Sequence, residues 1–169
     1  MIVSDTNCDF AQCNVTELFP KNPDSISAIG VGDINKDGLD DIAIVQSAED
    51  DYPTIFLQTA AGTFAEVFFS AAATPMFKGR ADTIAIVDIN GDGWGDVVSR
   101  TSSTANDTSA TTVEIFVNQR TTPLTLSIAN RYESFGYRAH SLFIGDLVRT
   151  GQTALGAAYA GTNQLVIKK

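Results

Sequence analysis

The chain reads DINKDGLDD over residues 33–41 and DINGDGWGD over residues 88–96. Both stretches place oxygen-bearing side chains at the first, third, fifth and ninth positions, and a glycine at the sixth. A loop that wraps a cation turns every second side chain inward, and a glycine at the sixth position permits the sharp turn that brings the seventh carbonyl onto the ion. The pattern therefore predicts two cation-binding loops.

The predicted ligands are all hard oxygen donors, and none is an imidazole or a thiolate. Five protein ligands plus water suit Ca²⁺ better than Mg²⁺. The acid at position nine falls where a β-strand is expected, and no bidentate Glu follows at position twelve, which favours a strand-loop-strand site over an EF-hand. We expect two Ca²⁺ ions, held by Asp33, Asn35, Asp37, the Leu39 carbonyl and Asp41, and by Asp88, Asn90, Asp92, the Trp94 carbonyl and Asp96.

The alternative interpretation of these residues is a turn rich in Asp, Asn and Gly that binds no metal. Three carboxylates in one loop repel each other when no cation is present, and this favours calcium. A weaker third copy begins at Asp146 and keeps Gly151, but it has Val148, Thr150 and Ala154 at ligand positions. We expect this third loop to fold like the others and to bind no ion.

The loops belong to a longer repeat that sets the architecture. Their first aspartates, Asp33, Asp88 and Asp146, are separated by 55 and then 58 residues. Strand-like runs flank each loop, and no stretch shows a sustained 3.6-residue apolar period. Four short antiparallel strands repeated at a fixed interval are typical of propeller blades. We expect an all-β fold, a propeller-like array of three four-stranded antiparallel blades that forms either a compact pseudo-threefold body or part of a larger propeller.

A single domain over residues 1–169 is expected, with an N-terminal segment at 1–24 and blades at 25–76, 77–130 and 131–169. The third unit is one strand short, and residues 15–19 resemble the last strands of the first two units, so they are candidates to complete the last blade. Strands are predicted at residues 25–31, 41–46, 54–58, 64–69, 83–87, 96–100, 112–117, 124–128, 141–144, 153–159 and 164–167.

Charge and composition exclude several classes of function. The 169 residues carry 20 Asp and Glu against 11 Lys and Arg, a formal net charge of −9. A net negative surface repels phosphate backbones, which argues against a nucleic-acid partner. No stretch has the roughly 20 predominantly apolar residues of a membrane helix, so no membrane insertion is expected. The first residues have neither the basic nor the apolar region of a signal peptide, so we expect export by another route or an excised piece.

The cysteines and the glycosylation sequons provide evidence on whether the protein is extracellular. Only Cys8 and Cys13 occur, which excludes a disulfide scaffold and a four-cysteine zinc site. A Cys8–Cys13 bridge and two free thiols are the alternatives. Sequons at Asn14 and Asn106 favour an extracellular protein.

Catalysis has little support in the sequence. His140 is the only histidine, and there is no Gly-x-Ser-x-Gly elbow, phosphate-binding glycine loop or CxxC motif. An ion would hold the loop carboxylates ionised and unavailable for acid chemistry. We therefore expect a binding protein and no enzyme. Six aromatic residues in or near loops are candidate partner contacts, with packing between blades as the alternative: Tyr52, Phe77, Trp94, Tyr132, Phe135 and Tyr137.

The two loops and their flanking strands resemble the FG-GAP/VCBS repeats of integrin-α-type β-propellers. Phe135-Gly136 ahead of Gly145-Asp146, with Gly156-Ala157-Ala158 after it, extends the resemblance to the third unit, so that it covers most of residues 25–169. The resemblance implies a calcium-stabilised blade array, extracellular or surface-exposed, that serves adhesion or binds glycans or proteins.

Two functions remain. The first is a calcium-stabilised recognition module for adhesion, or for receptor or glycan binding, on a cell or virion surface. The second is a non-catalytic structural subunit or fragment of a larger assembly, including a homo-oligomer, that uses its blades for protein contacts only. Binding lost in EGTA and in Asp92→Ala supports the first. Blank glycan and cell-binding assays together with self-assembly support the second.

Overall fold

The computed structural model describes residues 2–3, 15–18, 26–46, 53–60, 62–67, 80–102, 111–133, 139–145, 153–159 and 164–168. These residues form thirteen β-strands, paired antiparallel, and no helix. The predicted all-β fold class is therefore confirmed. Over this part of the chain no helix exists that could cross a membrane.

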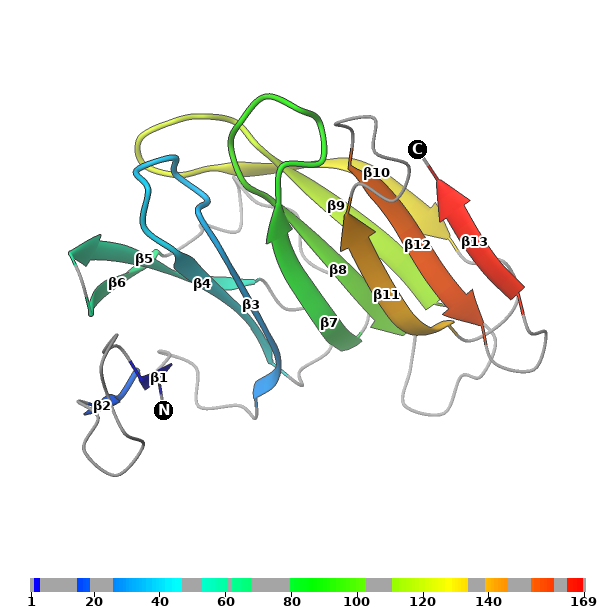
Figure 1. The fold of residues 1–169 in the computed structure, drawn as a ribbon, viewed down its shortest axis with the longest axis horizontal. Coiled ribbons are helices and arrows are strands. Elements are labelled where there is room, and N and C mark those ends of the chain that lie inside the picture. Colours follow the sequence, from blue (N-terminus) through cyan, green and yellow to red (C-terminus); the bar gives the residue numbers. More distant parts are fainter. Residues whose placement is uncertain are drawn as a thin grey trace.

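Three sheets follow one another along the chain and across the view in Figure 1, each with its strands in sequence order. The first sheet contains β3 (Ile26–Gly32), β4 (Asp41–Gln46), β5 (Thr54–Ala60) and β6 (Thr63–Val67). The second contains β7 (Arg80–Val87), β8 (Asp96–Ser102), β9 (Thr111–Asn118) and β10 (Leu126–Glu133). The third contains β11 (Ala139–Gly145), β12 (Ala154–Tyr159) and β13 (Gln164–Lys168).

One register is common to the three sheets, so the sequence repeat is also a repeat of structure. In every sheet the residue two positions before the first aspartate of the loop pairs with the residue nine positions after it. These pairs are Val31 with Ile42, Ile86 with Val97, and Ile144 with Leu155. A register shift recurs earlier in the same strands, between residues 26 and 28, 81 and 83, and 139 and 141. The third sheet thus keeps the strand register of the others, although its loop sequence lacks most of the predicted ligand residues.

The N-terminal strands differ from the prediction. Val15–Thr16 (β2) pairs with Ile2–Val3 (β1) in a separate two-stranded sheet and not with the third sheet, which has three strands among the described residues. Just after β2, the side chain of Leu18 packs against the first sheet. The expectation that residues 15–19 complete the last blade is therefore corrected, since apolar contact with the first sheet holds this segment at the opposite end of the array.

Apolar side chains alternate along the strands and cover both faces of the first sheet. The strand β4 is buried throughout, because Ile42 and Ile44 point to one face while Ala43 and Val45 point to the other. Fully burying one such aliphatic side chain contributes about 1.5–3 kcal/mol. Two shared clusters join neighbouring sheets. First and second sheets share Ala43, Val45, Ile55, Ile84, Ile86, Val97 and Phe116, and the second and third share Val98, Val113, Ile115, Leu142, Ile144 and Leu155.

Two glycines allow the first and second sheets to approach closely. A Cβ added at Gly30 would lie 2.9 Å from the Cα of Ala85, and one added at Gly32 would lie 3.0 Å from the carbonyl oxygen of Ile86. Side chains at these positions would push β3 away from β7. This close packing brings the two acidic loops that follow β3 and β7 together at one end of the sheets.

Candidate functional site

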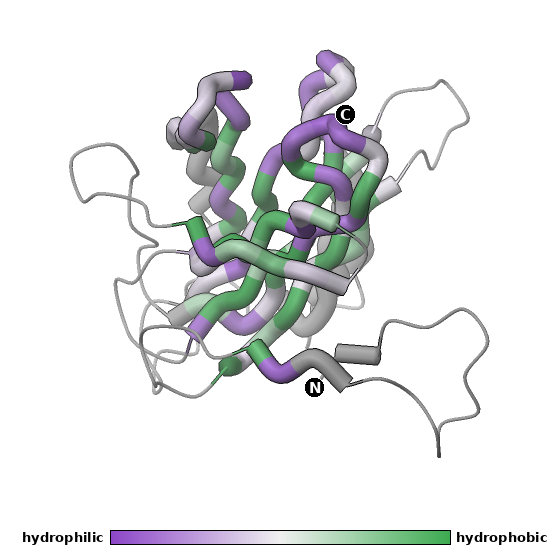
Figure 2. The backbone as a smooth tube through the Cα atoms, turned by 90° about the vertical axis from the view of Figure 1, so that its left-hand side faces the viewer, coloured by the Kyte–Doolittle hydropathy of each residue, from purple (hydrophilic) through white to green (hydrophobic). Residues whose placement is uncertain are grey.

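The first loop (residues 33–41) and the second loop (residues 88–96) occupy equivalent places. One connects β3 to β4 and the other connects β7 to β8, and both lie at the upper end of the sheets in Figure 1. Hydrophilic residues gather at this end in Figure 2, whereas the strands are largely hydrophobic. Ile34 is fully buried in the core between the sheets, which anchors the first loop at its second position.

Side chains of the first loop hydrogen-bond its own backbone. The Asp33 carboxylate accepts the N–H groups of Asp37 (3.2 Å) and Gly38 (2.9 Å). Asn35 accepts the Asp37 N–H through Oδ1 (3.1 Å) and donates from Nδ2 to the Asp37 carboxylate (2.9 Å). The remaining Asp37 oxygen accepts the N–H of Leu39 (2.9 Å). The predicted ligands therefore close the loop by hydrogen bonding.

The second loop repeats this network. The Asp88 carboxylate accepts the N–H groups of Asp92 (3.0 Å) and Gly93 (2.7 Å). Asn90 accepts the Asp92 N–H (2.9 Å) and donates to the Asp92 carboxylate (3.1 Å), which also accepts the N–H of Trp94 (2.9 Å). Two stretches 55 residues apart thus adopt one conformation, since they share their polar residues.

The aspartate at position nine is fully buried in both loops and ties three segments together. Asp41 accepts the N–H of Ile34 (2.9 Å) at the start of its loop and the N–H of Gln58 (2.8 Å) on β5. At Asp96 the equivalent donors are the N–H groups of Ile89 (3.1 Å) and Asn118 (2.9 Å). This carboxylate therefore links the loop, the second strand of its sheet and the third strand.

Burial raises the pKa of Asp41 and of Asp96 above the usual range for a carboxyl group, because desolvation disfavours the charged form. The backbone N–H donors act in the opposite direction. Like-charge repulsion from the aspartates at positions one and five of the same loop raises the pKa further. Each loop therefore concentrates negative charge around a buried acid.

Positive φ angles show how the loops turn. Gly38 and Gly93, at position six, have φ of 85° and 83°, a left-handed conformation that glycine adopts without steric cost. At position four the loops differ, because Lys36 takes a φ of 62° whereas Gly91 takes 79°. The N–H of Gly91 also donates to the Asp88 carboxylate (2.7 Å).

The two loops touch through the side chain of Asn118 at the end of β9. Its Nδ2 donates to the carbonyl of Ile34 in the first loop (2.7 Å) and to that of Gly95 in the second (3.2 Å). Gly95 leaves no room for a side chain, since a Cβ there would lie 2.6 Å from the carbonyl oxygen of Asp33. The second loop is therefore packed directly on the first.

An equivalent contact joins the second loop to the third sheet. Thr153, at the position corresponding to Gly95, donates from Oγ1 to the carbonyl of Asp88 (2.8 Å). Position eight of each later unit thus contacts the carbonyl at position one of the unit before it. The same contact therefore occurs between the first and second units and between the second and third units.

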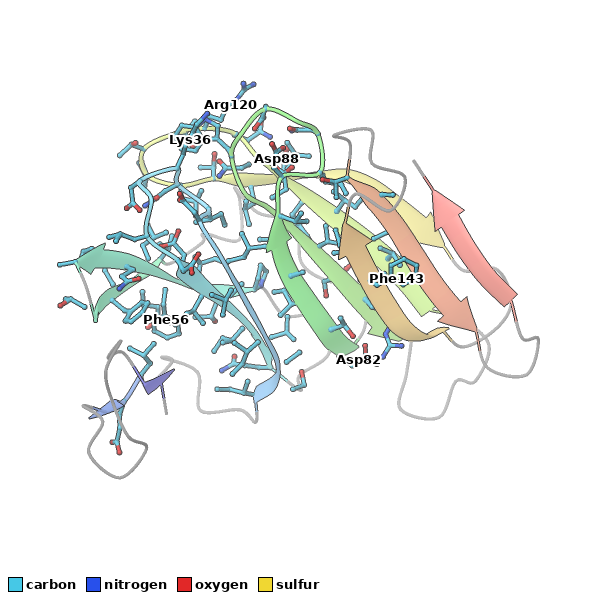
Figure 3. All side chains as sticks on the ribbon, in the orientation of Figure 1. Lys36, Phe56, Asp82, Asp88, Arg120 and Phe143 are labelled. Atoms are coloured by element: carbon cyan, nitrogen blue, oxygen red, sulfur yellow. The ribbon has the colours of Figure 1, made fainter. Side chains whose placement is uncertain are left out.

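Cationic side chains lie next to the second loop. The Nε of Arg120 is 3.7 Å from Asp92, and the Lys36 Nζ would lie 2.5 Å from a Cβ added at Gly93. Figure 3 shows Lys36, Arg120 and Asp88 together at this end of the molecule. The pKa of Asp92 is lowered, chiefly by the hydrogen bond from the backbone N–H of Trp94, with smaller contributions that include Arg120 and Lys36.

The donor chemistry of each loop fits a hard divalent cation. The predicted ligand set of each loop is three carboxylates, one amide oxygen and one carbonyl, all oxygen donors of the kind that Ca²⁺ prefers. Asn35 and Asn90 each direct their NH₂ group to the neighbouring carboxylate. Within the described ranges, no three His, Cys, Asp or Glu side chains are arranged to hold a metal ion. Calcium ligation stays a prediction that the loop chemistry permits.

All ten predicted ligand residues lie in the described part of the chain, five in each loop. Asn118, Gln58, Lys36 and Arg120 complete the surroundings of the loops, and the sequence analysis missed them. With its amide oriented to satisfy both contacts, Gln58 donates to the Asp40 carbonyl (2.9 Å) and accepts the N–H of Gly62 (2.9 Å). A second repeated motif, Phe56-Leu57-Gln58 and Phe116-Val117-Asn118, is the signal that could have identified these two strand-end residues.

Several other candidate residues lie outside the described residues or have no described side chain. Cys8, Cys13, both sequon asparagines, and the aromatic residues Tyr52, Phe77, Phe135 and Tyr137 are outside, as are the third-loop residues 146–152. Tyr132 lies in β10 and His140 in β11, with backbone described only. Trp94 is partly exposed in the second loop.

Comparison with known proteins identifies the repeat. Residues 33–99, from the start of the first loop through the second loop into β8, match the family model of an FG-GAP-like repeat. The predicted resemblance to FG-GAP repeats is therefore confirmed over these residues. This repeat is a β-rich module that is often found in adhesion proteins and is typical of extracellular proteins. No curated protein matches the chain.

Proposed function

We propose that this protein is a calcium-stabilised recognition module of the β-propeller type, used for adhesion or for receptor or glycan binding at a cell or virion surface. The observation that carries the proposal is the duplicated loop. Two stretches of chain with the same five oxygen donors adopt the same conformation, and each places three predicted carboxylate ligands within nine residues. One such loop is an ordinary turn motif, but two in register favour a shared ligand.

Calcium would be held by Asp33, Asn35, Asp37, Asp41 and the carbonyl of Leu39, and by the equivalent residues of the second loop. The ion would supply two positive charges that offset the repulsion among the carboxylates. The residues themselves position the loops by accepting backbone N–H groups.

The propeller arrangement is supported by the repeated packing of the sheets. The three sheets share one register, and position eight of each later unit contacts position one of the unit before it. A structure that repeats the same contact between successive sheets turns about an axis, as propeller blades do. We propose that the sheets are blades of such an array.

The recognition surface in this proposal is the loop end of the sheets. Trp94 is partly exposed there, Lys36 and Arg120 are exposed, and Arg120 lies beside the carboxylate of Asp92. An aromatic ring beside charged groups is suited to a sugar ring or to a polar protein surface. The proposed role is binding and not catalysis.

The test is a binding assay on a glycan array and on cells, in Ca²⁺ and in EGTA. We expect binding in Ca²⁺ that is lost in EGTA and in Asp92→Ala. The matched control is Asp40→Ala, which removes an exposed acid of the first loop, at position eight, that belongs to no predicted ligand set. Binding by Asp92→Ala equal to the wild type in both buffers would overturn the calcium-dependent function.

A spectroscopic test addresses the second loop alone. Trp94 is the only tryptophan, and its carbonyl is a proposed ligand. Tb³⁺ bound in this loop should therefore emit when the indole is excited, and Ca²⁺ should compete it away. Emission should disappear in Asp92→Ala and persist in Asp37→Ala, since Asp37 belongs to the first loop. Emission that survives in Asp92→Ala would place the ion elsewhere.

A further inference from the structure

The face of the first sheet that points away from the second sheet exposes large apolar side chains. Ile29 and Val31 on β3 are each 58% exposed, and Ile26 on the same strand is 47% exposed. Farther along this face, Leu18 and Phe64 pack on Ile42, Ile44 and Phe56. The uncovered part is therefore confined to β3, the strand next to the second sheet in the array. We call this part the β3 face, defined by Ile29 and Val31.

Residues at the same repeat positions are covered in the second and third sheets. Ile84 and Ile86, equivalent to Ile29 and Val31, are only 5% and 8% exposed and lie in the cluster shared with the first sheet. In the third sheet the equivalents, Leu142 and Ile144, pack against the cluster of the second sheet. These positions thus receive the preceding sheet wherever a preceding sheet is present.

The opposite end of the array has the complementary gap. Gly32 on β3 is packed against Ile86, with a Cβ there only 3.0 Å from the Ile86 carbonyl oxygen. Gly145 on β11 is its repeat equivalent, and a Cβ added there would meet nothing within 4 Å. Beside it, the ring of Phe143 lies across Gly156 of β12 and presents an apolar surface on the third sheet (Figure 3). We call this part the Gly145 face.

We propose that the β3 face of one molecule packs on the Gly145 face of a second copy, head to tail. By the repeat equivalence, Val31 of one copy takes the place over Gly145 that Ile86 takes over Gly32. A second copy is the occupant that fits, since both faces are on this chain and the equivalent apolar positions already pack on the preceding sheet twice within it, with Val87 in place of the glycine at the second interface. The inference rests on the propeller arrangement of the proposed function.

Two copies joined in this way close on themselves. A head-to-tail interface forms a ring if the rotation closes and a filament if it does not. Each copy contributes three sheets, so two copies bring the array to six blades, within the usual range of four to eight for propellers. Burial of Ile29 and Val31 at both interfaces also removes an apolar patch that a soluble monomer would expose.

The experiment measures molar mass by light scattering after gel filtration, for the wild type and three variants. Val31→Lys places a charge on the β3 face, and Gly145→Trp fills the Gly145 face at a position with free space. Thr63→Lys, on an exposed residue of β6, is the matched control for the added charge. Circular dichroism and thermal melting verify that each variant is folded.

We expect the wild type and Thr63→Lys at twice the 18.0 kDa chain mass, and Val31→Lys and Gly145→Trp at the mass of one chain. Mixing the two monomeric variants should restore one-to-one pairs, because each retains one intact face. A monomeric wild type, a filament, or a dimer lost in Val31→Lys but kept in Gly145→Trp overturns the head-to-tail pairing. A monomeric wild type that binds calcium and glycan would contradict the pairing but agree with the proposed function. A dimer that binds neither would agree with the pairing but contradict the proposed function.

Discussion

The two acidic loops share their internal hydrogen bonds but differ in their contacts with neighbouring segments. Within each loop the aspartates at positions one and five and the asparagine at position three make the same hydrogen bonds. The surroundings differ, because the second loop is packed on the first loop through Gly95 and Asn118 and contacts Thr153 of the third unit. In the first loop, position eight is the exposed Asp40. The shared sequence motif therefore determines the conformation of each loop, whereas the position of the loop among the sheets determines which neighbours it contacts.

This difference predicts that equivalent substitutions cost more in the second loop. The first comparison is Asp96→Ala against Asp41→Ala. Each leaves two N–H groups without their acceptor, so each should lower the free energy of unfolding by about 2–3 kcal/mol. Asp96→Ala should cost about 1 kcal/mol more, since it also frees Asn118, which bridges the loops. Urea denaturation measures both, and an equal loss in the two variants would contradict the bridging role.

Asn118→Ala against Gln58→Ala is the next comparison. Asn118 is buried and its amide bridges two carbonyls, so its removal should cost about 2 kcal/mol, whereas the half-buried Gln58 should cost about 1 kcal/mol because water can replace its partners. The same denaturation experiment decides. A larger loss of unfolding free energy in Gln58→Ala than in Asn118→Ala would contradict the bridging role of Asn118.

Position eight tests the contact between the loops. Gly95→Ala should lower stability by about 1–3 kcal/mol, because the new Cβ would overlap the Asp33 carbonyl and the sheets must shift. Asp40→Ala, at the same position of the first loop, should change stability by less than about 0.5 kcal/mol because the side chain is exposed. Thermal melting of both proteins is sufficient, and a neutral Gly95→Ala would mean that the loops are not in close contact.

Position four should give the smallest effects, of opposite sign. Lys36→Gly should raise stability by about 0.5 kcal/mol, since it relieves a left-handed lysine but adds freedom to the unfolded chain. Gly91→Lys should lower stability by about 1 kcal/mol, because it introduces that same strain. Both changes are readable as shifts of the urea midpoint. Shifts in one direction for both variants would rule out backbone strain as the cause.

Much of the fold follows from local patterns in the sequence. Each of the eleven strands predicted within the repeats is present, and β4 has the predicted bounds because turn chemistry and full burial mark both of its ends. The Asp- and Asn-rich turns were predictable for the same reason, since glycine and the Asx residues act within nine residues. The all-β class needed no more than this.

What the sequence could not supply were contacts between distant segments. Asn118 lies 84 residues from the Ile34 carbonyl that it binds, and the repeated Phe-x-Gln/Asn motif can mark it as a strand-end residue without indicating that partner. The pairing of Val15–Thr16 with Ile2–Val3 was missed because similarity to other last strands says nothing about which edge is nearer. Lys36 comes close to the second loop only once the first sheet packs on the second, and Arg120 does so only once β9 pairs with β8.

The central claim is that the two loops are calcium sites of equal design. Titration calorimetry with Ca²⁺ tests it most directly on the wild type, on Asp37→Ala and on Asp92→Ala. We predict two ions for the wild type and one for each variant, with Kd of roughly 10⁻⁴ to 10⁻³ M. At about 1 mM calcium each site should then add about 0.4–1.4 kcal/mol of stability. No binding heat, together with one melting temperature in EDTA and in millimolar Ca²⁺, would contradict the claim.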